Sequence, residues 1–122
     1  MTFQSLGLSP AVERAMDTAG YQDPTAVQTK TIPTVLKGKD VLVIAQTGTG
    51  KTASFIAPML DLMQAGTSLE SNQVKGLILV PTRELAVQVH QSIIEYGMHS
   101  GLRTGVVYGG VTFVGSNAGS LD

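Results

Sequence analysis

The sequence has no cysteine and no tryptophan, and only 14% of its 122 residues are charged. Without cysteine there can be no disulfide and no thiolate metal site, so we expect a cytoplasmic protein. No apolar run approaches the ~18 residues of a membrane span, and the first five residues lack a secretion signal, so we expect no membrane association. The formal net charge of -1 excludes a global basic field. Any nucleic-acid contact would therefore need a local patch.

Hydrophobic periodicity predicts two helices near the start of the chain. Ser9 and Pro10 are typical of a helix start, and Gly20 of a helix end, which favours a helix over about 10–19. A second helical stretch starts at Thr25, and Pro33 predicts its interruption.

The remainder of the chain predicts an α/β fold. Three apolar, β-branched runs are typical of buried strands and cover 41–45, 76–80 and 104–108. Helical patterns over about 51–64 and 83–96 separate them. Strands that are joined by helices imply a parallel sheet with right-handed connections.

The loop after the first predicted strand is close to the pattern G-x-x-x-x-G-K-[ST], with Ala45 in place of the first glycine. It consists of Ala45, Gln46, Thr47, Gly48, Thr49, Gly50, Lys51 and Thr52. Small residues let backbone N–H groups converge on phosphate oxygens at a helix N-terminus. Lys51 would reach the β and γ phosphates, as the candidate catalytic residue, and Thr52 would supply a hydroxyl to Mg²⁺.

Two other interpretations of this loop are weaker. One is a glycine-rich turn with an ordinary surface lysine, which the position between a strand and a helix disfavours. The other is a dinucleotide site, because Gly48, Gly50 and Ala53 also match G-x-G-x-x-A. That site needs an acidic residue at the end of the next strand, where Val80 and Pro81 stand instead.

Gln28 and Tyr21 are candidates for recognising a purine. A glutamine amide can pair with the N6 donor and N7 acceptor of adenine and so reject guanine, and an aromatic ring can stack on the base. Thr25 and Gln28 also have the spacing of a capping box, in which Gln28 would only close a helix N-terminus. The spacing leaves the two alternatives evenly open.

With these motifs the sequence closely resembles the DEAD-box RNA helicase family, from Phe3 to about Val111. Phe3 with residues 20–28 resembles the family's Q motif, residues 45–52 its motif I, and residues 81–86 its motif Ia. The resemblance implies binding of ATP and Mg²⁺, with Gln28 and Tyr21 on adenine. It also implies that an RNA backbone runs along motif Ia and a Gly-Gly motif, through Pro81, Thr82, Arg83, Gly109 and Gly110.

The resemblance further implies a three-layer RecA-like fold of the P-loop NTPase type, with helices on both faces of a truncated parallel sheet. We expect residues 1–114 to form part of the first helicase domain, with a Q-motif region at 1–40 and a βαβαβ core at 41–114. The small and polar residues over 115–122 predict a flexible tail.

The family's Asp-Glu-Ala-Asp motif, its Ser-Ala-Thr motif and its second domain do not occur in this sequence. Phosphoryl transfer needs a carboxylate that orients water and an arginine on the developing charge, so we expect this chain alone to lack ATPase and unwinding activity. A binding module without catalysis and an inert, partly folded fragment are the alternatives. Uncovered apolar sheet edges also predict a dimer or an aggregate.

Overall fold

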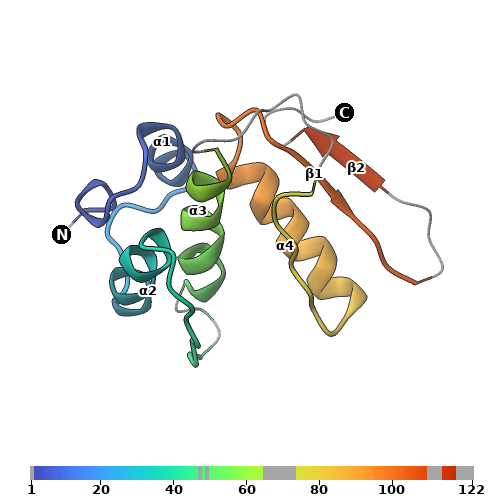
Figure 1. Ribbon diagram of the computed structural model, residues 1–122, viewed down its shortest axis with the longest axis horizontal. Helices are drawn as coiled ribbons and strands as arrows, with labels where there is room; N and C mark the ends of the chain where they lie inside the picture. Colours follow the sequence, from blue (N-terminus) through green and yellow to red (C-terminus); the bar gives the residue numbers. More distant parts are fainter. Residues whose placement is uncertain (1, 47, 49, 65–73, 110–113, 118–122) are drawn as a thin grey trace.

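The computed structural model describes residues 2–46, 48, 50–64, 74–109 and 114–117. In Figure 1, helix α4 lies between helix α3 and strands β1 and β2, and helices α1 and α2 lie on the other side of α3. The elements are the 3-10 turn η1 (Gln4–Leu6), α1 (Pro10–Thr18), α2 (Ala26–Leu36), α3 (Lys51–Gln64), α4 (Arg83–Tyr96), β1 (Arg103–Val106) and β2 (Val114–Asn117).

Helix α1 begins and ends as the sequence predicts. The Ser9 hydroxyl caps it by accepting a hydrogen bond from the Val12 N–H, and Gly20 follows it with a φ of 97°. The Ser9 backbone N–H and hydroxyl also donate to the two carboxylate oxygens of Asp61, at 2.7 and 2.5 Å. This pair of bonds ties the start of α1 to α3.

Helix α2 is longer than predicted, because it continues through Pro33 to Leu36. Proline removes one backbone donor from a helix, but the carbonyl of Pro33 still accepts from the Lys37 N–H at 3.2 Å. Ile32, with 0% exposure, belongs to the core on which α2 packs against α3. The predicted interruption is therefore wrong, since tertiary packing holds the two halves of the helix in line.

The hydrophobic core lies among the first three helices and the inner face of α4. Helix α3 contributes most to it and stays one helix through Pro58. The fully buried apolar side chains, each with 0 or 1% exposure, are Val12, Ala15, Met16, Ile32, Ala53, Ile56, Ala57 and Leu60.

The predicted parallel sheet is not confirmed. Among the described residues the only sheet is the antiparallel pair of β1 and β2, in which Arg103 faces Asn117 and Val106 faces Val114. Residues 41–45 and 76–80 are assigned to no strand. The third predicted strand does occur, as β1, but it pairs with a segment that the sequence predicts as a tail. Residues 115–117 belong to β2, and 118–122 lie outside the described residues.

The two unpaired segments have an alternating pattern of exposure. Ile78 and Val80 pack against the core, whereas Leu77 and Leu79 are 74 and 85% exposed. Leu42 and Ile44 are 87 and 89% exposed. Alternation of this kind is typical of a strand with one covered face, and here the other face has no cover. The apolar runs therefore have the side-chain pattern of strands, but no strand among the described residues pairs with them.

Candidate functional site

The predicted phosphate loop folds back on itself ahead of α3. The Lys51 ammonium group donates to the Ala45 carbonyl oxygen at 2.9 Å, which joins the two ends of the loop. Gly48 and Gly50 have φ values of 87° and 81°, a region that favours glycine. Thr47 and Thr49 lie outside the described residues. The described part of the loop is therefore bent over the helix N-terminus, where backbone N–H groups and the helix dipole favour an anion.

Gln28 joins the start of α2 to this loop. Its side-chain oxygen accepts from the Thr25 N–H at 2.9 Å, and the Thr25 hydroxyl accepts from the Gln28 N–H at 3.3 Å. The capping box that the sequence left open is therefore formed. The Gln28 amide nitrogen also donates to the Gly50 carbonyl at 3.2 Å. A single side chain thus caps α2 and contacts the loop.

The contact between Gln28 and Gly50 requires glycine at position 50. A Cβ atom there would overlap the amide nitrogen of Gln28, and the positive φ would strain any other residue. An amide oxygen has two lone pairs and an amide nitrogen two hydrogens, so Gln28 keeps capacity for further bonds. Its exposure is 0%, so a base could reach it only after a local opening.

Tyr21, the other predicted adenine contact, lies in an aromatic cluster with Phe3 and Tyr96. Its ring packs edge to face on the Phe3 ring, with the two centroids 6.3 Å apart. Its hydroxyl lies 2.9 Å from the Tyr96 hydroxyl. Burial, with help from this hydrogen bond, raises the pKa of Tyr96 above its ordinary value. These contacts join η1 to the end of α4, and they differ from the contacts that Gln28 makes.

Three of the predicted RNA-contact residues, Pro81, Thr82 and Arg83, lie at the start of α4. The Thr82 hydroxyl caps the helix by accepting from the Leu85 N–H at 3.2 Å, and Pro81, Thr82 and Arg83 are all exposed. The Arg83 guanidinium lies over the Tyr108 ring, 5.9 Å from its centroid. This contact places residues 81–83 near the exposed Gly109, while Gly110 lies outside the described residues. Sequence reasoning missed Tyr108, although an aromatic residue directly before two glycines was a possible signal.

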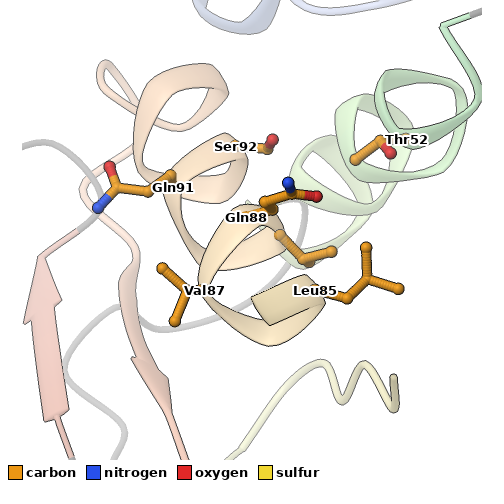
Figure 2. Close-up of a pocket in the computed structure, with 7 residues that line it drawn as sticks. Thr52, Leu85, Val87, Gln88, Gln91 and Ser92 are labelled. Carbon is orange, nitrogen blue, oxygen red and sulfur yellow. The ribbon is translucent and has the colours of Figure 1, made fainter. Parts of the chain in front are cut away.

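A shallow hollow of about 380 Å³ lies beside Thr52, between α3 and α4. Figure 2 shows Thr52 on α3 opposite Gln88 and Ser92 of α4, with Leu85 below them. All the lining side chains are neutral, so the hollow by itself offers no charge for phosphate. Thr52 is half-buried at its edge.

Neither histidine belongs to a metal site within the part of the chain that the structure describes, where no three acidic or histidine side chains gather. His90 is buried on α4, and burial lowers its pKa while a hydrogen bond to the Thr104 backbone opposes that shift. His90 is therefore a buried packing residue of α4. No helix in the described ranges has the length and apolarity to cross a membrane.

Comparison with known proteins finds helicases by both the family model and the individual relatives. A family model described as "DEAD/DEAH box helicase" matches residues 25–118. The chain is 44% identical over 109 residues to the DEAD-box ATP-dependent RNA helicase CshA of Bacillus cereus, covering 89% of this chain and 20% of that protein. It is 44% identical over 119 residues to the ATP-dependent RNA helicase DeaD of Mycobacterium tuberculosis, covering 97% of this chain and 20% of that protein.

A solved structure agrees with these matches. The crystal structure of a DEAD box protein from Methanococcus jannaschii is similar with a TM-score of 0.75 and 35% identity. The similarity covers 92% of this chain and 30% of that one. The chain spans about 20% of the length of the two RNA helicases named above.

Proposed function

Since this chain belongs to the DEAD/DEAH box helicase family, we propose that it binds ATP with Mg²⁺ and the backbone of an RNA strand, as the N-terminal part of an ATP-dependent RNA helicase. The observation that carries the proposal is the hydrogen bond from Gln28 to the Gly50 carbonyl. It joins the residue that would select the base to the loop that would hold the phosphates. Such a junction suits a ligand that has both a base and phosphates.

The phosphates would lie in the loop over 45–52. Lys51 already has its ammonium group at the mouth of the loop, on the Ala45 carbonyl, and would exchange that neutral acceptor for phosphate oxygens. The backbone N–H groups of the loop would supply further donors, and the Thr52 hydroxyl would hold Mg²⁺. Bound Mg²⁺ would neutralise charge on the β and γ phosphates.

The RNA backbone would run past the start of α4, along Pro81, Thr82, Arg83, Gly109 and Gly110. Support comes from the exposure of residues 81–83 and from the contact of Arg83 with Tyr108 beside Gly109. A guanidinium and the free N–H groups of a helix N-terminus are both suited to phosphate oxygens.

We also propose that this chain alone binds ATP without hydrolysing it. The sequence has no two adjacent acidic residues. The one acidic residue of α3, Asp61, accepts hydrogen bonds from Ser9. Hydrolysis needs a carboxylate that orients water and a cation on the developing charge, which the relatives' additional length could supply.

Replacing Gln28 with alanine is expected to abolish a preference for ATP over GTP. The amide that distinguishes N6 from O6 would be gone, while Lys51 and the loop backbone would still bind the triphosphate. Titration with fluorescent ATP and GTP analogues measures the ratio of the two dissociation constants. An unchanged ratio in Gln28→Ala would contradict adenine recognition by this residue.

Two further variants separate recognition from capping. Thr25→Ala removes the helix cap but leaves the Gln28 amide, so it should lower stability by about 0.5–2 kcal/mol and keep the preference for ATP. Gln22→Ala removes an exposed glutamine of the same region and should change neither property.

A second proposal concerns the uncovered apolar segments. We infer that residues 41–45 and 76–80, which have no strand partner among the described residues, can pair as strands with a second copy of the chain. Leu42, Ile44, Leu77 and Leu79 expose most of their surface, and unpaired strand edges favour pairing with another chain.

Self-association is therefore expected to increase with concentration. Light scattering after size-exclusion chromatography should show a rising mass for the unmodified chain. The double variant Leu77→Asp and Leu79→Asp should raise the dissociation constant of the dimer at least about tenfold. Full burial of one leucine side chain contributes about 1.5–3 kcal/mol of free energy. Val87→Asp, at an exposed apolar site on α4 outside the two segments, is the matched control. A monomer mass for the unmodified chain at every concentration would refute the proposal.

A further inference from the structure

We propose that Tyr108 is a positioning residue that holds the Arg83 guanidinium for a phosphate of the RNA strand. The inference rests on the proposed RNA contact and adds to it a residue outside the motifs. Its basis is the 5.9 Å separation of the Arg83 guanidinium carbon from the centroid of the Tyr108 ring.

A cation–π contact with Tyr108 can leave the binding groups of Arg83 available. A guanidinium is planar, and its five N–H donors point outward in that plane. A ring that lies against the face of the group contacts none of these donors and attracts the positive charge through its quadrupole. Tyr108 can therefore restrict Arg83 without competing with a phosphate.

Arg83 needs such a restraint because of where it lies. It is exposed at the first position of α4, and an exposed arginine side chain has about 2 kcal/mol of rotamer entropy to lose on binding. Tyr108 is half-buried next to the end of β1, so its ring is the more fixed member of the pair. A pre-oriented arginine loses less entropy when it binds a phosphate.

The surroundings also favour an anion at this point. The first N–H groups of α4 have no acceptor within the helix, and the Thr82 hydroxyl is bonded to Leu85. Gly109 follows Tyr108 and is exposed, so a nucleic-acid backbone can approach closely. Arg83 and the helix N-terminus would thus bind the same stretch of phosphates.

The alternative role for Tyr108 is direct stacking on a base. Arg83 already lies over the ring, which is only partly exposed, so the contacts favour the positioning role. The two roles differ in one respect that can be measured: only the positioning role depends on Arg83.

A double-mutant cycle on the 122-residue chain tests the inference. Fluorescence anisotropy with a labelled single-stranded oligouridine, at several salt concentrations, gives the affinity and its salt slope. Tyr108→Leu should weaken binding about two- to fivefold, as expected for an exposed cation–π contact, and Tyr108→Phe should restore it. Arg83→Gln should lower the salt slope by about 0.7, the value for one phosphate of a single strand. In the Arg83→Gln background, Tyr108→Leu should cause no further loss.

Each outcome supports or refutes the positioning role of Tyr108. A loss on Tyr108→Leu that is equal in both backgrounds would overturn the positioning role in favour of base stacking or a structural role. If Arg83→Gln weakens binding while Tyr108→Leu does not, positioning is refuted and the RNA contact stands. If the unmodified chain binds no RNA at any salt concentration, the proposed RNA contact and the role of Tyr108 are both refuted. Equal melting temperatures of the variants would exclude unfolding as the cause.

Discussion

Replacing Lys51 with alanine is expected to weaken ATP binding about ten- to a hundredfold. Hydrogen bonds to charged groups contribute about 1.5–3 kcal/mol each, and Lys51 is the cation at the mouth of the loop that closes on Ala45. The variant also loses the bond to the Ala45 carbonyl, so the loop would be less ordered before it binds. Calorimetric titration with ATP and Mg²⁺ measures the change.

Lys39→Ala is the matched control for this variant. Lys39 is an exposed lysine just before the segment that leads to the loop, so its removal changes the net charge equally. It should alter ATP affinity less than about twofold, because exposed charges at a distance are screened by salt. Equal losses in Lys39→Ala and Lys51→Ala would mean that only overall charge matters, and would refute a specific phosphate loop.

Shortening Leu60 to alanine is expected to lower the free energy of unfolding by about 2–5 kcal/mol. Leu60 has 1% exposure on α3 and belongs to the core that also holds Met16 and Ile32. The change removes buried methyl groups and leaves a cavity that the packed helices cannot fully close. With a typical slope of 1–3 kcal/mol/M, the urea midpoint should fall by about 1 M or more.

Leu62→Ala provides the control on the same helix. Leu62 is 41% exposed, so the same chemical change removes much less buried surface. Its cost should be below about 1 kcal/mol, and α3 should keep its helical circular dichroism in both variants. Equal destabilisation by the two variants would show that α3 does not pack on the core through Leu60.

The helices could be predicted well from the sequence because their signals are local. Ser9 caps α1 at the start that Ser9 and Pro10 predict, and α4 covers Arg83–Tyr96, as the helical pattern predicts. Capping groups and apolar spacing act within one or two turns, so neighbouring residues contain the information. Pro33 misled the prediction because the buried face of α2 holds that helix together from outside the local sequence.

The sheet could not be predicted in the same way. The runs at 41–45 and 76–80 have the composition of strands, but a strand needs a partner for its backbone N–H and C=O groups. Composition does not specify that partner. β1 pairs with β2, most of which the sequence predicted as part of a tail, and the other two runs have no strand partner among the described residues.

The candidate site was predicted in part. The loop over 45–52 and the residues 81–83 follow motifs in the sequence, and their assignments to ATP and RNA remain proposals. The roles of Gln28 and Tyr21 show the limit of motif spacing. Gln28 caps α2 and bonds to Gly50 as well, whereas Tyr21 packs on Phe3 and Tyr96. Tyr108 could be related to Arg83 only once the chain was folded.

The sequence by itself determined where α1, α3 and α4 lie and to which family the chain belongs, since each depends on groups that are close along the chain. Only the tertiary structure decided that Gln28 meets Gly50, that Arg83 meets Tyr108 and that Asp61 bonds to Ser9. These pairs are distant in sequence. They form because burying the apolar faces of the helices brings their ends together, and no local pattern contains that requirement.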